Sequence, residues 1–489
     1  MSAIITTKFR YQNANTLVQG LNGSLDDVYY LFIGRSFSWT SDSNPPTPED
    51  TQYQEFDAQQ NIFALKKLAA TNVSRAIPRY NWISGSTYSE YDDQDSALST
   101  KQYFVVTDEL SVYKCIKAGS GGSSIKPTGS STSIGSVLAD GYQWKYMYTL
   151  SGSDVAKFNT ASFIAVKTLE TDDDSVQWDV QQAALPGAIH RIKITSGGSG
   201  YTTKPTVTIS GDGEDCTVVA ADVTISGGAV TEILINPARC GHGYTNATVS
   251  FSGGTTGTPA TARAIISPKG GHGADAVSEL GAFYVMVDVQ LVADEGSGDF
   301  VVDNDFRQIG LIANPYETNS GAVALMGRWV TGTEYTTGDV VYYDGMSYVA
   351  SSDHTAAATF AEDVATYWDA AAVANSATLN ALTVITYSNL VGTLAKDQDV
   401  IGLTSTATGW VDSIDTDNSK IKFHQNATSG FKSFEVGETI TVGAATATID
   451  SIEAPEYVPM SGKLVYLENL SPVNRNISQT EDIKLVLEL

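Results

Sequence analysis

Two alternating segments near the end of the chain constrain its fold most strongly. In residues 461–471 and 479–489 hydrophobic side chains alternate with polar ones, and Pro472 lies between the two segments. Alternation with a period of two predicts β-strands with one buried face, and the proline predicts a turn. A strand at a chain end needs a neighbour for its backbone hydrogen bonds, so we expect the last strand to be held in a sheet.

The composition and the other patterns indicate the same fold class. The chain has 489 residues with 43 glycines and 24 tyrosines, which is typical of a β-protein with many turns. The spacing of hydrophobic residues predicts one helix at 57–70. Strands are expected at residues 27–34, 102–107, 111–117, 142–150 and 281–293. We therefore predict a mainly β fold, an α+β core with few helices, in a discontinuous multi-domain β-sandwich or β-barrel architecture with small inserted β domains.

An internal repeat occupies a segment in the first half of the chain. Residues 199–211 recur as 242–253, and Tyr201 in the first copy corresponds to Tyr244 in the second. Between the copies, the Gly-Gly pair at 227–228 separates two alternating segments and predicts a β-hairpin. Each copy has one hydrophobic face, so we expect the copies to bury these faces against each other in a small sandwich or prism.

Residues 328–370 are rich in aromatic side chains, including Trp329, Tyr343 and Trp368. Their spacing resembles a small carbohydrate-binding module of the chitin- and cellulose-binding type. That resemblance implies that the three rings contact a glycan, because the C–H face of a sugar is apolar and its rim is polar. The alternative is that the same rings form the core of a module of about 45 residues, which needs such a core to fold.

Several short stretches occur in the order found in one known family. They are TKFR (7–10), YYLFIGRS (29–36) with Trp39, AIPR (76–79) with Trp82, VYKCI (112–116), DGYQWKYMY (140–148), DFRQIGLIANP (305–315) and the closing strands (461–489). With these stretches the chain resembles the gene product eight baseplate wedge subunits of T-even-type contractile-tailed phages. The resemblance covers about residues 1–185, 277–318 and 457–489.

The resemblance implies a virion structural protein that is not an enzyme and has no catalytic or cofactor-binding residues. Members of the family are β-rich, dimeric components of the baseplate wedge. They bridge neighbouring wedge proteins and change contacts when the sheath contracts. We therefore expect a homodimer that binds other wedge subunits, is assembled in the host cytoplasm and resides in the tail baseplate of the virion.

The stretches that carry the resemblance are interrupted by segments that look like insertions. The expected organisation is a first core segment (1–189), an inserted repeat module (190–276), a second core segment (277–327), an inserted aromatic module (328–372), an inserted barrel or sandwich module (373–456) and a third core segment (457–489). Loops accept such insertions at little cost in folding free energy.

Charge and hydropathy exclude two classes of partner. The formal net charge is −26, and phosphate neutralisation needs clustered Lys and Arg, so nucleic-acid binding is not expected. No hydrophobic run reaches the ~18–20 residues of a membrane-spanning helix, so we expect no membrane insertion. The N-terminus lacks the pattern of a secretory signal.

The sequence contains no clear catalytic, metal or cofactor site. Cys115, Cys216 and Cys240 are expected to be buried free thiols, with a Cys216–Cys240 bridge as the alternative. Cys240 and His242 lie two residues apart and would bind zinc only with further ligands, so a turn beside a buried thiol is preferred. No Gly-x-Ser-x-Gly elbow is present for a hydrolase.

Three arginines stand out in this acidic chain, because each lies beside a hydrophobic run in a stretch that carries the resemblance. Arg35, Arg79 and Arg307 are candidates for docking to acidic partner surfaces, where the guanidinium fork gives orientation. The alternative is that they form internal salt bridges or hydrogen bonds to loop carbonyls.

Two other functions are alternatives to the structural role. The first is a glycan-binding tail adhesin or host-recognition protein, which contacts host surface glycans through the inserted modules. The second is a tail-associated depolymerase or lysozyme, for which the sequence offers no positive feature.

Overall fold

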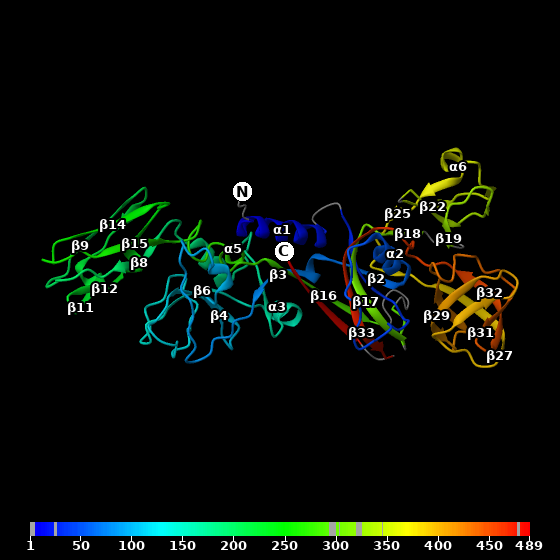
Figure 1. Ribbon diagram of the computed structural model, residues 1–489, viewed down its shortest axis with the longest axis horizontal. Coiled ribbons are helices and arrows are strands. Elements are labelled where there is room, and N and C mark those ends of the chain that lie inside the picture. Colours follow the sequence, from blue (N-terminus) through cyan, green and yellow to red (C-terminus); the bar gives the residue numbers. More distant parts are fainter. Residues whose placement is uncertain are drawn as a thin grey trace. The chain divides into compact units, whose positions relative to one another are not determined.

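The computed structural model describes residues 5–23, 27–292, 300–302, 304–318, 325–344, 346–476 and 480–489. Strands make up 42% and helices 13%, which confirms the mainly β class. The described residues form two compact units, whose elements are labelled in Figure 1. Unit 1 comprises Met1–Thr16, Ser74–Met286 and Val486–Leu489, and unit 2 comprises Leu17–Val73 and Val287–Leu485. Each unit is thus built from segments that are distant in sequence.

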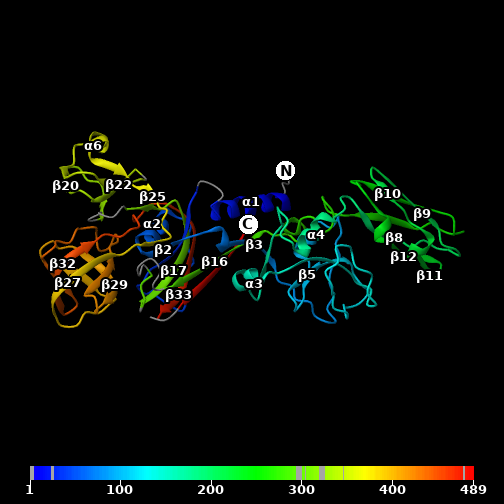
Figure 2. The ribbon, with the colours of Figure 1, turned by 180° about the vertical axis from the view of Figure 1, so that it is seen from behind.

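Unit 2 contains a five-stranded antiparallel sheet, which we call the core sheet. Its strand order is β26 (Thr378–Asn380), β2 (Ile62–Lys67), β1 (Tyr29–Gly34), β17 (Asn304–Ala313) and β33 (Lys463–Arg475). Strands β2, β17 and β33 of this sheet are labelled in Figure 2. Strand β17 pairs with β1 and with β33, and Leu311 lies opposite both Leu31 and Tyr466. Leu31 and Phe32 are adjacent on β1, so their side chains point to opposite faces of the sheet, and both are fully buried. This explains why the strand is hydrophobic on both faces.

The predicted helix at 57–70 is wrong. Helix α2 (Gln52–Gln60) starts earlier, where the backbone N–H of Gln54 donates to the Thr51 hydroxyl at 3.2 Å. Residues 62–67 form β2 instead, and Phe63 is buried. Pairing with β1 and burial of hydrophobic side chains outweigh a helical spacing, because tertiary contacts override local propensity.

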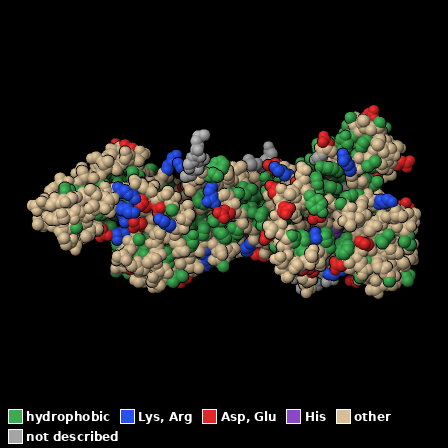
Figure 3. All heavy atoms as spheres, viewed as in Figure 1, with side chains coloured by type: hydrophobic (Ala, Val, Ile, Leu, Met, Phe, Trp, Pro, Cys, Tyr) green, Lys and Arg blue, Asp and Glu red, His purple; other side chains and the backbone are tan. Residues whose placement is uncertain are grey.

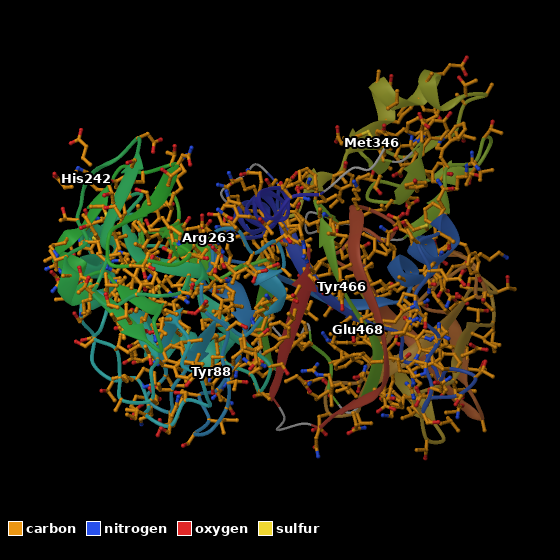
Figure 4. The ribbon with its side chains drawn as sticks, turned by 60° about the vertical axis from the view of Figure 1, so that its left-hand side comes forward. Tyr88, His242, Arg263, Met346, Tyr466 and Glu468 are labelled. Atoms are coloured by element: carbon orange, nitrogen blue, oxygen red, sulfur yellow. The ribbon has the colours of Figure 1, made fainter. Side chains whose placement is uncertain are left out.

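The closing segments form two strands, as predicted, but Pro472 does not mark a turn. It lies inside β33, where the register shifts between Phe306 and Gln308. Because β33 is an edge strand, the missing N–H of proline costs little there. Tyr466 and Glu468 on β33 are labelled in Figure 4, and the Tyr466 hydroxyl donates to Glu468 at 2.7 Å.

The last strand is held in a sheet, which confirms that prediction. β34 (Thr480–Glu488) belongs to a second sheet with the order β34, β16 (Tyr284–Val292), β3 (Val73–Pro78) and β7 (Phe163–Val166). Helix α1 (Thr7–Leu21) was not predicted. Its residue Arg10 donates to the Leu489 carbonyl at 2.5 Å and thereby fastens the C-terminal residue.

Unit 2 also contains a closed six-stranded barrel. Its order is β27 (Thr383–Val391), β30 (Lys420–His424), β29 (Thr408–Asp415), β28 (Asp399–Gly402), β31 (Thr439–Val442) and β32 (Ala445–Glu453). Ile385, Val400 and Val411 belong to its fully buried core. Val384 lies opposite Glu453, so the chain enters and leaves the barrel at neighbouring positions.

A small aromatic module lies between β18 (Tyr316–Glu317) and β25 (Ala372–Val373), which pair with each other. Its elements are β19 (Leu325–Arg328), β20 (Glu334–Tyr335), β21 (Val340–Tyr343), β22 (Met346–Ala350), β23 (His354–Thr355), α6 (Phe360–Tyr367) and β24 (Trp368–Ala370). Strands β19, β21, β22 and β24 form one sheet. Because β18 and β25 pair, the two chain ends of this module also meet.

In unit 1 the predicted strands at 102–107, 111–117 and 142–150 are confirmed. They are β4 (Phe104–Val106), β5 (Ser111–Lys117) and β6 (Gln143–Thr149), which form a three-stranded sheet. Tyr142 and Trp144 stack at 5.7 Å in a buried aromatic cluster of this region. The short helices of unit 1 are α3 (Gly152–Phe158), α4 (Val176–Gln182) and α5 (Ala276–Glu279).

The internal repeat contributes strands to a six-stranded sheet in unit 1. Its order is β11 (Val223–Ser226), β12 (Ala229–Leu234), β8 (Ile189–Ser196), β15 (Thr261–Ile266), β14 (Ala247–Ser252) and β9 (Thr206–Gly211). The hairpin at 227–228 is confirmed as β11 and β12. The two repeat copies pair edge to edge, with Thr208 opposite Ser250, rather than packing face to face as predicted. The backbone N–H and C=O groups of the two copies thus hydrogen-bond to each other within one sheet.

Charged side chains of unit 1 pair with one another over β8 and β15, where blue and red atoms lie together in Figure 3. Arg263, labelled in Figure 4, and Lys193 both bond to Asp92. Burial alone would raise the pKa of Asp92, but the hydrogen bonds from Arg263 and Lys193 hold it below its ordinary value. These cations are therefore engaged within the chain.

Candidate functional site

The loop that follows β1 in unit 2 brings two of the candidate arginines together with two aromatic rings. We call it the Arg35 cluster, and its members are Arg35, Phe37, Trp39, Asp42 and Arg307. Strand β1 ends at Gly34, and the loop begins with the next residue. Glycine is required at position 34 because a Cβ there would lie 2.6 Å from the Asn61 carbonyl oxygen. Arg35 then adopts a φ of 60°, which turns the chain into the loop.

Arg35 is held between two aromatic rings. Its guanidinium carbon lies 4.0 Å from the ring centre of Phe37 and 3.7 Å from that of Trp39. The Asp57 carboxylate is 3.7 Å from its Nη1. The Trp39 indole N–H donates to the Leu470 carbonyl on β33 at 2.9 Å, so the loop is fastened to the edge of the core sheet.

Arg307 is buried beside the same loop and is only 5% exposed. Its Nε and Nη2 donate to the two carboxylate oxygens of Asp42 at 3.0 and 2.9 Å, and its Nη1 donates to the Ser36 carbonyl. The hydrogen bond from Arg307 lowers the pKa of Asp42 to about 2. Arg307 thus uses its donors to hold the loop in place, which matches the internal alternative for this residue.

A buried polar chain connects the loop to the barrel. The Ser36 hydroxyl donates to Oδ1 of Asp412 at 2.7 Å, and Nδ1 of His424 lies 2.7 Å from Oδ2 of the same carboxylate. The three residues are at most 4% exposed. Asn61 and Asn426 add a 3.3 Å hydrogen bond across the same joint.

This chain contains serine, aspartate and histidine but has the wrong order for a hydrolase triad. In a triad the histidine takes the proton of the serine, and the aspartate orients the histidine. Here the carboxylate of Asp412 lies between Ser36 and His424. The serine hydroxyl therefore donates its hydrogen bond to Asp412 and not to His424. The arrangement is suited to fixing the loop on the barrel.

Arg79 belongs to unit 1 and is not brought together with Arg35 and Arg307. Its Nε donates to the Asn81 side chain at 2.9 Å, and its Nη1 donates to the Asn159 side chain at 2.7 Å. It lines an open groove of about 470 Å³ together with Trp82 and Lys126. Arg79 therefore stays partly accessible on the surface of its own unit.

The aromatic residues with a predicted glycan contact lie in the core of the aromatic module. Trp329 is 9% and Trp368 is 5% exposed. Tyr343 stacks on Phe360 with ring centres 4.2 Å apart, and Trp329 packs edge-on against both rings. Tyr335 covers Trp368 at 5.1 Å. The rings contact one another, as the core alternative describes.

The cysteines are free thiols, as predicted. Cys216 and Cys240 lie directly opposite each other on β10 (Glu214–Cys216) and β13 (Cys240–His242). Burial raises the pKa of Cys216 to about 12, which disfavours the thiolate that binds metals. Among the residues that the structure describes, no group of three His, Cys, Asp or Glu side chains is placed to hold a metal ion.

No protein-family model matches the sequence, and no curated protein matches it significantly. Within the described ranges, no helix is both long and hydrophobic enough to cross a membrane.

Several residues of the site were not singled out from the sequence. Ser36 lies in a stretch that carries the resemblance, and Asp42 lies in the adjacent proline-containing loop. The positions of these two residues in the sequence could therefore have pointed to them. Asp412 and His424 had none, because their roles arise only when the barrel meets a loop that is 376 positions away in the sequence. Such contacts have no local sequence signature.

Proposed function

We propose that this chain is a structural subunit of a contractile phage tail, a baseplate wedge protein that bridges neighbouring wedge subunits. One observation supports this proposal above the others. Three stretches that carry the resemblance, 29–36, 305–315 and 461–489, contribute the adjacent strands β1, β17 and β33 of the core sheet. Segments that carry the resemblance and are separate in the sequence thus belong to one continuous sheet.

The way in which the modules join this sheet supports the same proposal. The aromatic module starts and ends at the paired strands β18 and β25. The barrel starts and ends at Val384 and Glu453, which face each other. Each module is therefore attached to the core through neighbouring chain ends, as expected for insertions into a shared scaffold.

The surface around the Arg35 cluster is the proposed contact with another subunit. On α2, Tyr53 is 82% and Phe56 is 39% exposed, and the partly exposed ring of Trp39 lies in the adjoining loop. Aromatic and arginine side chains are enriched at protein interfaces, where they supply rigid contact area. Such a surface lets a chain of net charge −26 bind a partner with little charge repulsion.

A homodimer belongs to this proposal, since a two-fold pair uses one self-complementary patch on both protomers. It is tested by light scattering after size-exclusion chromatography on three chains: the full chain, one lacking 319–371 and one lacking 384–452, each deletion closed by a short glycine-serine linker. We expect the mass of a dimer for all three chains. A monomer, or an association lost with either module, would contradict self-association through the core.

A further inference from the structure

An open hollow lies on the outer face of the barrel, beside the loop after β1. It has a volume of about 400 Å³, within the range of small-molecule sites. It is lined by Phe37, Asp399, Thr408, Trp410, Asn426, Thr428 and Ser429. These residues all belong to unit 2, and none of them was singled out from the sequence.

Two aromatic rings and one carboxylate form the walls of the hollow. The rings of Phe37 and Trp410 meet edge to face, with centres 6.2 Å apart and planes inclined by 71°. Trp410 on β29 lies directly opposite Asp399 on β28, so both side chains stand on the same face of the barrel wall. The next residue, Val411, is fully buried in the barrel, as the alternation of a strand requires.

The polar groups of the hollow fall into two sets. Asn426 and Ser429 hold the rim, since the side chain of Asn426 accepts from the backbone N–H groups of Thr428 and Ser429 at 2.9 and 3.1 Å. The Asp399 carboxylate and the hydroxyls of Thr408 and Thr428 have no partner among the described residues of the chain. These groups can therefore bind a ligand, and the hydrogen bonds of Asn426 fix the rim around them.

We propose that this hollow binds one sugar ring of a glycan. The rings of Phe37 and Trp410 offer an apolar surface for the C–H face of a sugar. The free carboxylate of Asp399 accepts hydrogen bonds from neighbouring sugar hydroxyls, and charge strengthens such bonds. The threonine hydroxyls both donate and accept, as sugar hydroxyls require. Among the described residues that line the hollow, Asp399 is the only charged one, so neutral and amino sugars bind and uronic acids are repelled.

This site goes beyond the baseplate proposal and does not depend on it. It also differs from the glycan contact expected from the sequence, because Trp329 and Trp368 are buried whereas Trp410 is partly exposed. A basic side chain of a partner protein is the competing occupant of a hollow with one carboxylate and two rings. The two threonine hydroxyls, which have no partner in the described part of the chain, favour the sugar, because a cation would need only the carboxylate and the rings.

The test is saturation-transfer NMR on the full chain with glucose, galactose, N-acetylglucosamine, glucosamine, glucuronic acid and arginine amide. We expect transfer to at least one neutral or amino sugar, with a Kd of about 1 mM, and little transfer to glucuronic acid. Asp399→Asn and Phe37→Ala should weaken that binding by about tenfold or more, a difference of about 1.4 kcal/mol. Asp417→Asn on an exposed barrel turn and Phe9→Ala on α1 are the matched controls and should bind as the wild type does.

Three results would overturn the assignment. The first is no transfer to any sugar at about 20 mM, well above the expected Kd. The second is sugar binding that Asp399→Asn and Phe37→Ala leave unchanged. The third is binding of arginine amide alone, abolished by Asp399→Asn, which would assign the hollow to a basic side chain of a partner protein. Asp399 is exposed and has no partner in the described chain, so its replacement leaves the fold intact.

Discussion

Arg307 on β17 and Asp42 in the loop after β1 face each other in a two-pronged ion pair, with nitrogen–oxygen distances of 3.0 and 2.9 Å. The two residues are 265 positions apart in the sequence. The pair joins the loop of the Arg35 cluster to β17. This strand lies between β1 and β33 in the core sheet, and all three strands come from segments that carry the resemblance. The buried guanidinium of Arg307 also donates to the Ser36 carbonyl and so fixes the position of Ser36, whose hydroxyl contacts the barrel.

This ion pair predicts a specific acid sensitivity. The hydrogen bond from Arg307 lowers the pKa of Asp42 from 3.8 to about 2, so the folded chain favours the ionised carboxylate. The resulting stabilisation is fully present above the unfolded pKa and is lost as the pH falls from about 4 toward 2. We expect the urea midpoint of the wild type to fall over this interval more steeply than that of Asp42→Asn. Equal slopes would show that the pair does not contribute; Asp417→Asn is the control.

Removing the Ser36 hydroxyl should loosen the joint between the loop and the barrel. Ser36→Ala leaves the buried Asp412 carboxylate without one of its hydrogen bonds, which costs about 1–3 kcal/mol. Urea unfolding followed by circular dichroism measures this loss. Thr40→Ala, at an exposed position of the same loop, is the control and should change stability by less than about 0.5 kcal/mol. A wild-type midpoint for Ser36→Ala would mean that water replaces the hydroxyl.

The fold class and many strands could be predicted from the sequence because their hydrophobic patterns are local. β1, β4, β5, β6, β16 and the hairpin of β11 and β12 are examples. The helix at 57–70 failed because the side chains from Ile62 to Leu65 satisfy a helical spacing and are equally able to line a buried strand. Only the presence of β1 as a neighbour selects the strand, and that pairing is not visible in the local sequence.

Gly310 on β17 should be intolerant of any side chain. A Cβ at this position would collide with the Phe32 ring on β1 and the Tyr466 carbonyl on β33. Gly310→Ala is therefore expected to destabilise unit 2 by about 1–3 kcal/mol, because the sheet must shift to admit the methyl group. Gly152→Ala, where a Cβ meets nothing within 4 Å, should be nearly neutral. Similar urea midpoints for both variants would contradict the close packing of the three strands.

The aromatic module should depend on Trp368 for its stability. Trp368 is 5% exposed and packs on Tyr335, so Trp368→Ala removes a large share of a small core and costs about 3–5 kcal/mol. We expect limited proteolysis to cut this variant rapidly between residues 325 and 373. Met346→Ala, at a 40% exposed position of the same module, should be cut no faster than the wild type. Resistance of Trp368→Ala would mean that the ring does not belong to the core.

The candidate site was only partly predictable. Arg35 and Arg307 stood out because each lies beside a hydrophobic run in an acidic chain, and the structure places both in the Arg35 cluster. Asp412, His424 and Trp410 could not be found in this way, because each lies in a barrel strand with ordinary alternation. Their proximity to the loop after β1 depends on how the barrel closes and docks within unit 2, and no short motif encodes that arrangement.

We propose that this chain is a structural component of a contractile tail. The most direct measurement is immunogold electron microscopy of purified phage particles that encode the chain, with an antibody raised against the full protein. The account predicts gold at the end of the tail distal to the head, in both extended and contracted particles, and no labelling of particles that lack the gene. Purified particles without the protein, or gold confined to fibres away from the baseplate, would contradict the account.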